Sequence, residues 1–241
     1  IPSFTFVATA HALEWLGITP VFCDIEVESQ NLDPDNVEAL ITPKTSAIVG
    51  VHVWGKPCNV EALQAIADKH NLALIFDAAH AFGCSHKGIM AGNFGDAEVF
   101  SFHATKFINS FEGGVISTND DALAERIRRL RNFGFTYYAT VENLGINGKM
   151  HEISAAMGIT SLESMEKITE INRANYELYK SCLAGIPGIE LIQYPSEEEN
   201  NYQYIVVVID VDRTGISRDQ IYNILHLEDV LARRYFYPGV H

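Results

Sequence analysis

Two side chains with complementary chemistry close predicted core strands of this chain, Lys106 and Asp77. Lys106 follows the apolar positions Val99, Phe100 and Phe102, and its amine can condense with an aldehyde once burial or a nearby cation lowers its pKa. Asp77 ends the unbroken apolar run LALIFD, which is typical of a parallel strand buried on both faces. Because ligands of open α/β sheets bind at the carboxyl ends of such strands, we expect both side chains at one site.

This pair is what a pyridoxal phosphate enzyme requires, since the cofactor needs a lysine for its aldehyde and an anionic partner for its ring nitrogen. Each residue alone has a simpler interpretation. Most lysines are solvated, and an aspartate after a strand can cap the next helix. The occurrence of both residues at predicted strand ends favours the cofactor hypothesis.

A strand, a helix and a second strand deliver Asp77 to the edge of the predicted sheet. Ser46 to Val53 is the first strand, Val60 to His70 the amphipathic helix, and Leu72 to Asp77 the second strand. This order and spacing predict a right-handed parallel crossover.

The other expected elements rest on apolar patterns and on caps. Asp33, followed by Pro34, predicts the start of one helix, and Ser217 that of another. In chain order we expect a helix over 8–16, a strand over 19–25, a helix over 34–40, a polar and aromatic loop over 133–144, one long helical stretch over 152–184 interrupted near 158, strands over 189–193 and 204–209, and a helix after 217.

Composition limits the classes of function. The chain has 241 residues, 47% hydrophobic and 20% charged, which is ordinary for a globular protein. Lys plus Arg number 17 and Asp plus Glu 31, so the net charge is 17 − 31 = −14, which argues against a nucleic-acid or anionic membrane partner. The four cysteines form no C-x-x-C pair and predict neither a zinc site nor a disulfide framework, so we expect reduced thiols in the cytoplasm.

Seven sequence blocks, in order and spacing, resemble the DegT/DnrJ/EryC1/StrS family of sugar aminotransferases, a branch of the aspartate-aminotransferase fold type. The blocks are PSFTFVATA (2–10), PVFCDIE (20–26), VHVWGKPC (51–58), FDAAHAFG (76–83), GDAEVFSFHATK (95–106), EGG (112–114) and GINGKMHEISAAMG (145–158). The resemblance implies an α/β fold (pyridoxal phosphate fold type I) with a mixed, mostly parallel seven-stranded sheet. It places the core of the large cofactor-binding domain at 1–165, and a linking helix with part of a small C-terminal α/β domain at 166–241. It also implies that relatives extend beyond both ends of this sequence.

The resemblance assigns roles around the cofactor. Lys106 would bind it covalently and act as the catalytic group, and Asp77 would hold the proton on the ring nitrogen. The further contacts implied are His80 to the phenolic oxygen, Ser101 to the phosphate, Phe6 over one ring face, and Asn147 reaching the phosphate of a neighbouring subunit. From the residues alone, core packing is the favoured interpretation of Phe6, and a structural hydrogen bond is the alternative for His80.

Four residues are candidates for substrate contacts. Lys149 stands where many relatives have arginine, so it keeps the charge but loses the bidentate geometry. Arg233, Arg234 and Tyr235 lie in an aromatic segment near the end of the sequence. Guanidinium groups suit the phosphates of a nucleotide-linked sugar, and a surface charge pair is the alternative.

The function implied by the resemblance is transamination of a nucleotide-linked keto sugar, in particular dTDP-4-dehydro-6-deoxyglucose, with L-glutamate as donor. The amino sugar would serve surface polysaccharide (O-antigen) or secondary-metabolite synthesis, in a homodimer with shared sites. Amination at C3 and a non-enzymatic regulatory role stay open as alternatives. A dehydratase of the same family would carry histidine in place of Lys106, and a nicotinamide-binding domain would need a G-x-G-x-x-G run that does not occur.

Overall fold

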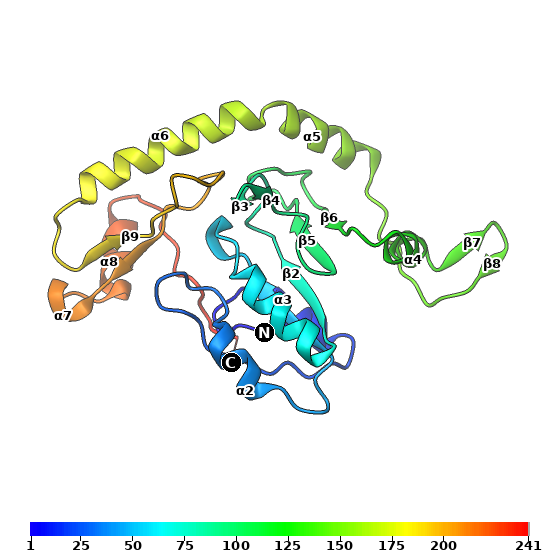
Figure 1. Cartoon of the computed structure of the whole chain (residues 1–241). Helices are drawn as coiled ribbons and strands as arrows, with labels where there is room; N and C mark the ends of the chain where they lie inside the picture. The colour runs from blue at the N-terminus through cyan, green and yellow to red at the C-terminus, as the bar shows by residue number, and fades with distance from the viewer. Residues whose placement is uncertain (241) are drawn as a thin grey trace.

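A four-stranded sheet lies at the centre of the computed structural model, which describes residues 1–240 (Figure 1). Its order is β1 (Ala47–Val51), β2 (Ala73–Asp77), β5 (Ala97–Ser101) and β6 (Gly114–Ser117). β1, β2 and β5 run parallel and β6 antiparallel, which confirms the predicted α/β class with a mostly parallel sheet. All other strands of residues 1–240 pair in separate two-stranded sheets, so four of the seven strands implied by the resemblance are formed.

The predicted parallel crossover is present. Helix α3 (Val60–His70) joins β1 to β2, and its bounds are those predicted. Asn59 caps its first turn, Asn71 ends it in the left-handed conformation, and Leu63 and Ala67 are fully buried against the sheet. This packing fixes the direction in which β2 enters the sheet.

The carboxyl ends of the parallel strands are in register. Asp77 lies beside Val51 of β1 and Val99 of β5. The backbone N–H of His52, directly after β1, donates to the Asp77 carbonyl at 2.9 Å. Side chains that follow these three strands therefore meet at one edge.

A fully buried histidine–carboxylate pair lies within the sheet core. The Nε2 atom of His52 lies 3.1 Å from Oε1 of Glu98, and both side chains are 0% exposed. The Nδ1 atom of His52 accepts from the Cys58 N–H, so Nε2 carries the proton of a neutral ring and donates to Glu98. The other carboxylate oxygen accepts from the N–H groups of Gly92 and Phe94 at 2.5 and 2.7 Å. One carboxylate thus joins β5, the loop before it and the segment after β1.

Replacing Glu98 by alanine is expected to lower the free energy of unfolding by about 3–5 kcal/mol, because the fully buried His52 and two half-buried backbone N–H groups lose their acceptor. Urea unfolding followed by circular dichroism measures this. Glu163→Ala, at an exposed position at the end of α5, is the control and should change stability by less than about 0.5 kcal/mol. Equal midpoints for the two variants would contradict a structural role of the pair.

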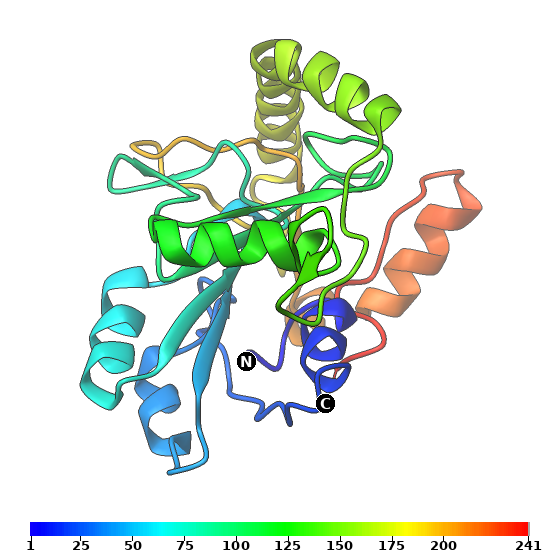
Figure 2. The ribbon, with the colours of Figure 1, turned by 90° about the vertical axis from the view of Figure 1, so that its right-hand side faces the viewer.

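The middle of the chain builds an extended arch. Helices α5 (Glu152–Glu163) and α6 (Met165–Leu183) run across the top of the molecule, and α4 (Asp121–Arg131) lies beside the sheet (Figures 1 and 2). The short hairpin β7 (Phe135–Tyr137) and β8 (Thr140–Val141) projects away from the body.

Two predictions for this region are wrong. Residues 133–144 contain the β7–β8 hairpin where a loop was expected, because Phe135 and Val141 pair across a tight turn. The long helix breaks at Ser164 instead of near Gly158. The Ser164 hydroxyl donates to the Thr160 carbonyl and its N–H to the Ser161 carbonyl, which ends α5 in a tighter turn.

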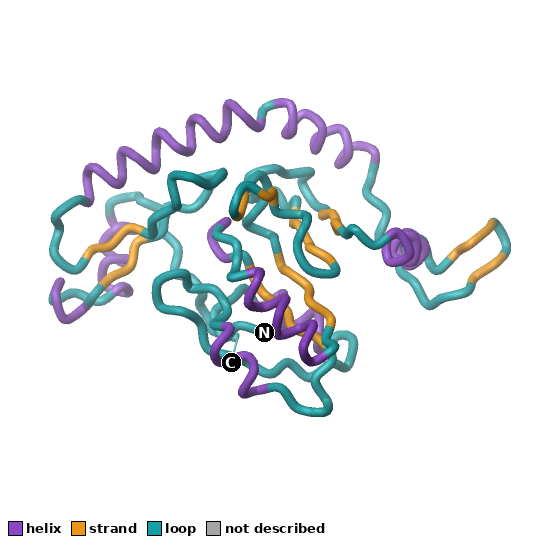
Figure 3. Tube along the Cα trace, in the orientation of Figure 1, coloured by secondary structure: helices purple, strands orange, loops and turns teal. Residues whose placement is uncertain are grey.

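The C-terminal part forms a small unit below the α6 end of the arch, at the other end from the β7–β8 hairpin (Figure 3). It contains β9 (Ile189–Leu191) paired with β10 (Val207–Ile209), α7 (Val211–Thr214) and α8 (Arg218–Leu227). Ser217 and Gln220 form a capping box at the start of α8, which confirms the predicted cap. The division of the chain at residue 165 stays a prediction.

The segment between β9 and β10 returns to the central sheet. We call residues 198–204 the strap; Figure 1 shows this loop pointing from β9 toward the hairpin of β3 (Ser85–His86) and β4 (Ile89–Met90). Ser85 and Glu199 exchange hydrogen bonds, and Asn200 donates to the Gly55 carbonyl at 3.2 Å. The strap therefore links the small unit to the parallel-strand edge.

At the N-terminus, helix α1 (Val7–Glu14) and helix α2 (Pro34–Leu40), capped by Asp33, form as predicted. The strand expected over 19–25 does not form. Pro20 offers no N–H to a ladder, and the segment makes only isolated bridges, Pro2 with Cys23 and Ile25 with Leu32. The short 3₁₀ helix η1 (Val53–Gly55) follows β1.

No helix within residues 1–240 has the length and apolar content to cross a membrane.

Candidate active site

Asp77, the last residue of β2, is held by two donors. The Thr9 hydroxyl donates to Oδ2 at 2.7 Å, and the Ala79 N–H donates to Oδ1 at 3.0 Å. The Thr9 oxygen lies 2.9 Å from the Thr5 hydroxyl. Because the Thr9 proton is used on the carboxylate, Thr5 must donate to Thr9, so the chain of hydrogen bonds runs from Thr5 to Asp77. The carboxylate is half-buried and fixed in orientation.

Thr9→Val is expected to cost about 1–2 kcal/mol in the free energy of unfolding, since Asp77 loses a donor and the buried Thr5 hydroxyl loses its acceptor. Urea unfolding at neutral pH measures the loss. Thr160→Val, which removes an exposed hydroxyl from α5, is the matched control. A Thr9 variant as stable as the Thr160 variant would remove Thr9 from the support of Asp77.

Lys106 lies five residues beyond β5, in an irregular loop. Its backbone N–H donates to the His103 carbonyl at 2.9 Å, and its side chain is half-buried. Within residues 1–240, no hydrogen bond or ion pair engages its amine. Burial lowers the pKa of Lys106, and the negative charge of Asp77 partly opposes this. The structure thus places an amine without a direct partner within the electrostatic reach of Asp77.

His80 is buried beside both residues. Its Nδ1 atom accepts from the Trp54 N–H at 3.2 Å, and its ring lies 4.3 Å from the Tyr204 ring and 5.8 Å from the Trp54 ring. Burial, and next the positive charge of Lys106, lower the pKa of His80 from 6.5 to about 3. The imidazole is therefore neutral at physiological pH, and its proton is on Nε2.

The low pKa of His80 makes folding sensitive to acid. Above pH 6.5 His80 is neutral in both the folded and the unfolded protein. Below pH 6.5 His80 binds a proton in the unfolded chain, but in the folded protein it stays neutral down to about pH 3. Stability therefore falls with pH by up to about 1.4 kcal/mol per pH unit in this window. Between about pH 7 and pH 5, urea unfolding should show a loss about 2 kcal/mol larger for the unaltered protein than for His80→Gln. Equal losses would contradict the burial of a neutral imidazole.

Ser101 and Phe6 are the remaining residues predicted to contact the cofactor in the same subunit. Ser101 ends β5, beside the strand that ends in Asp77, and its oxygen accepts from the His103 N–H at 3.4 Å. Phe6 immediately precedes α1, its carbonyl accepts from the Thr9 N–H, and its ring is 59% exposed. Ser101 thus lies in the strand that pairs with β2, and Phe6 precedes the helix whose Thr9 holds the Asp77 carboxylate.

Tyr204 is a residue of this site that sequence reasoning missed. Burial raises the pKa of its phenol, and the charges of Tyr235, Arg233 and Asp77 also act on it. Its ring packs between those of His80 and Tyr235, with centroids 4.3 and 6.1 Å away. Arg233 and Tyr235 are thus brought to the edge where Asp77 lies.

Arg234 points elsewhere. Its guanidinium lies 3.5 Å from an oxygen of Asp219 and stacks over the rings of Tyr222 and Tyr237, at 4.8 and 4.1 Å from their centroids. This is the surface charge pair that the sequence left open as an alternative.

Asn147 and Lys149 lie apart from Lys106, in the exposed segment that follows the β7–β8 hairpin. The Lys149 amine donates to the Asn147 side chain at 2.5 Å and lies 4.5 Å above the Phe133 ring. Asn147 pairs with Asn132 at the end of α4. A hollow of about 540 Å³ between β6, α4 and residues 144–148 adjoins this segment.

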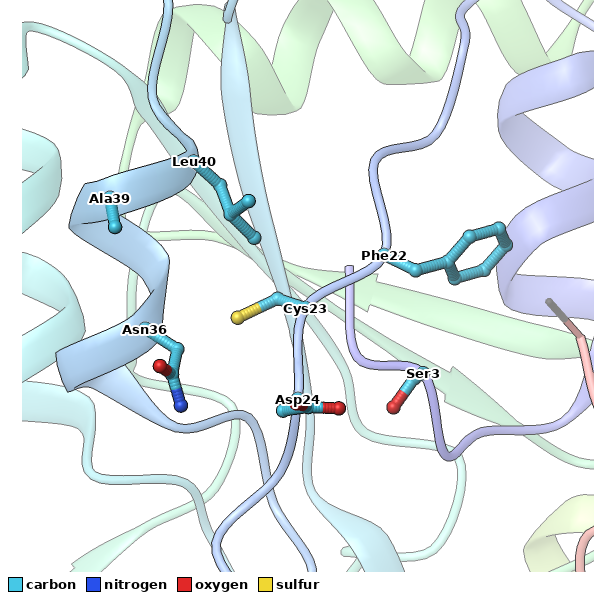
Figure 4. A pocket seen from close by; sticks show the side chains of 7 residues that line it. All are labelled: Ser3, Phe22, Cys23, Asp24, Asn36, Ala39 and Leu40. Atoms are coloured by element: carbon cyan, nitrogen blue, oxygen red, sulfur yellow. The ribbon is translucent and has the colours of Figure 1, made fainter.

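A second hollow, of about 380 Å³, opens beside α2 (Figure 4). It is lined by Ser3, Phe22, Cys23, Asp24, Asn36, Ala39 and Leu40, and in the close-up Leu40 points toward Cys23 while Phe22 points away. It contains none of the residues with perturbed pKa values at the strand edge, so it is separate from the candidate site.

The donor set at the strand edge fits pyridoxal phosphate. An amine without a direct partner, a carboxylate fixed by Thr9 and an imidazole with its proton on Nε2 match an aldehyde, a protonated ring nitrogen and a phenolic oxygen in turn. Among residues 1–240, no group of three or more His, Cys, Asp or Glu side chains could hold a metal ion.

Comparison with known proteins gives consistent results. The model of the DegT/DnrJ/EryC1/StrS aminotransferase family matches residues 1–241. The dTDP-4-amino-4,6-dideoxy-D-glucose transaminase of Shigella dysenteriae is 42% identical over 238 residues, 98% of this chain and 64% of the relative. Its namesake from Escherichia coli is 43% identical over 98% of this chain and 63% of the relative.

Among solved structures, DesI in the presence of its TDP-sugar product superimposes with a TM-score of 0.95 at 52% identity. The match covers 100% of this chain and 61% of DesI. The chain thus spans less than two thirds of the length of these relatives.

Proposed function

The chain belongs to the DegT/DnrJ/EryC1/StrS aminotransferase family, and from this we infer that it contributes the active site of a pyridoxal phosphate-dependent sugar aminotransferase. The observation that carries the proposal is the Lys106 amine, half-buried, without a direct partner and of lowered pKa, within electrostatic reach of Asp77 and neutral His80. The proposed reaction transfers the amino group of L-glutamate to a nucleotide-linked keto sugar, dTDP-4-dehydro-6-deoxyglucose. The names of the Shigella and Escherichia coli relatives support this choice of sugar.

Each residue of the strand edge has a task in the proposal. When bound, pyridoxal phosphate supplies an electron sink for the carbon that loses its proton. Asp77 keeps the ring nitrogen protonated, and Thr9 keeps the carboxylate aligned. His80 donates from Nε2 to the phenolic oxygen, Ser101 contacts the phosphate, and Phe6 covers a ring face.

Lys106 acts on the proton. A lowered pKa leaves more of its amine neutral near physiological pH, so Nζ would take a proton from the substrate carbon and deliver it to the cofactor carbon C4′ on the other side of the shared nitrogen.

Substrate contacts are proposed at two places. Arg233 and Tyr235, next to Tyr204, would contact the phosphates of the sugar nucleotide, and Arg234 would anchor this segment to Asp219 of α8. Lys149 would act with Asn147 at the subunit boundary. The amino sugar would enter O-antigen or secondary-metabolite synthesis.

We further propose a homodimer with shared sites, in which Asn147 reaches the phosphate bound by the neighbouring subunit. The exposed apolar side chains around Asn147 support this, because Leu144 is 98% and Ile146 71% exposed. A cytoplasmic location is supported by Cys23, Cys58, Cys84 and Cys182, all of which are free thiols.

The test is an absorbance titration of the purified protein with pyridoxal phosphate, followed by L-glutamate. A visible band that grows with cofactor and fades with glutamate is expected, and adding dTDP-4-dehydro-6-deoxyglucose should restore it. A band that ignores every amino donor would favour the regulatory alternative. Restoration only by a 3-keto sugar nucleotide would favour amination at C3, and the lack of any band would overturn the cofactor assignment.

A further inference from the structure

The side chain of Gln203, in the strap, forms hydrogen bonds with the backbone on both sides of Lys106. Its Nε2 donates to the Thr105 carbonyl at 2.6 Å, and its Oε1 accepts from the Phe107 N–H at 2.9 Å. Only one orientation of the amide satisfies both contacts, since a flipped amide would set its NH₂ against an N–H and its oxygen against a carbonyl. The glutamine thus pairs with residues 105–107 as a neighbouring β-strand would.

The Lys106 loop depends on such a contact. It lies outside every helix and strand, between β5 and β6, and the Lys106 amine has no direct partner of its own within residues 1–240. The position of the amine is therefore set by the backbone of the loop. Phe107, directly after it, is 6% exposed, so its N–H would lack a partner without Gln203.

The strap holds His80 through the same short segment. Asn201, 1% exposed, donates from Nδ2 to the carbonyls of His80 and Phe82 at 2.9 and 3.0 Å. Its Oδ1 accepts from the Gln203 N–H at 3.0 Å. The carbonyl of Asn201 in turn accepts from Asn172 of α6 at 3.0 Å, which anchors the strap to the long helix.

We propose that Gln203 is a positioning residue for Lys106, and that with Asn201 it sets the spacing between the lysine and His80. The inference rests on the proposed function, because it concerns the lysine that would bind the cofactor. Both hydrogen bonds of the Gln203 side chain go to backbone groups, so it contributes by holding the amine where Asp77 and His80 act on it.

Three variants test the proposal. Gln203→Met keeps the length of the side chain and loses both hydrogen bonds. Gln203→Glu can still accept from the Phe107 N–H but has no proton for the Thr105 carbonyl. Asn31→Leu is the control for stability: Asn31 is another buried amide that grips backbone, at Val53, Lys56 and Pro57, and it does not contact the Lys106 loop.

Two readouts are combined, hydrogen exchange of the Phe107 amide in the cofactor-free protein and the growth of the visible band on adding pyridoxal phosphate. Gln203→Met should speed amide exchange about tenfold and slow band growth about tenfold, with kcat falling and the KM for L-glutamate within about twofold. Gln203→Glu should keep the amide protected yet slow the band. Asn31→Leu should lower the melting temperature and leave both readouts unchanged.

The outcomes separate this inference from the proposed function. If the unaltered protein forms the band and Gln203→Met forms it at the same rate, Gln203 has no positioning role, whatever its effect on exchange. Unchanged exchange of the Phe107 amide in Gln203→Met would also overturn the inference. If the unaltered protein forms no band, the proposed function itself fails.

Discussion

Lys106→Ala is expected to abolish the visible band formed with pyridoxal phosphate and to lower the transamination rate at least about a thousandfold. The amine of Lys106 is the group proposed both to bind the cofactor aldehyde and to move the proton, and alanine can do neither. Absorbance titration and single-turnover conversion of L-glutamate to 2-oxoglutarate measure the two losses separately.

The matched control is Lys167→Ala, which removes an exposed lysine from α6 and should leave band and rate unchanged. Added ethylamine should restore part of the lost rate of Lys106→Ala, because a free amine can enter the space left by the side chain. A full band in Lys106→Ala would show that another lysine binds the cofactor and would overturn the assignment of Lys106 as the cofactor-binding residue.

Asp77→Asn should lower kcat about a thousandfold while the visible band still forms. Two opposite charges about 4 Å apart in a partly buried site interact by about 4 kcal/mol, which corresponds to about three powers of ten in rate. Asparagine keeps the shape and one acceptor but not the charge, so the ring nitrogen would lose its proton. Stopped-flow absorbance of the half-reaction with L-glutamate measures this effect.

Asp68→Asn, on the exposed face of α3, is the control for Asp77→Asn and should react at the unaltered rate. A rate of Asp77→Asn within tenfold of the unaltered rate would contradict a role of the carboxylate at the ring nitrogen. Loss of the band in that variant would instead indicate a folding defect at the end of β2.

Local signals made much of the fold predictable. Helix α3 and the strand ending in Asp77 follow from apolar periodicity, and α2 and α8 from their capping residues Asp33 and Ser217. Errors arose where hydrogen-bond partners that the apolar pattern does not reveal determine the structure. A strand over 19–25 needs a neighbouring strand to pair with. The helix breaks at Ser164 because its hydroxyl donates to the Thr160 carbonyl, and this could not be predicted from the glycine at 158.

The residues of the candidate site likewise fall into those that could be predicted from the sequence and those that could not. Asp77 and Lys106 could be predicted because each follows an apolar strand, and the resemblance added the roles proposed for His80, Ser101 and Phe6. Thr9, Tyr204 and Gln203 were not predicted, since nothing near them in the sequence records their partners. The three amides Asn200, Asn201 and Gln203 were the one available signal, because buried carboxamides usually hold backbone groups.

The strap also determines when the site can exist. Its hydrogen bonds to the Lys106 loop span 96 and 98 residues, and that from Asn201 to His80 spans 121. Contacts of such high order close late in folding, after the local β1–α3–β2 unit has formed. A nascent chain on the ribosome that has not yet released residue 203 carries Asp77, His80 and Lys106 without the contact that sets their spacing. On the proposed function, cofactor capture would follow synthesis of the strap and would mark a chain that is complete to that point.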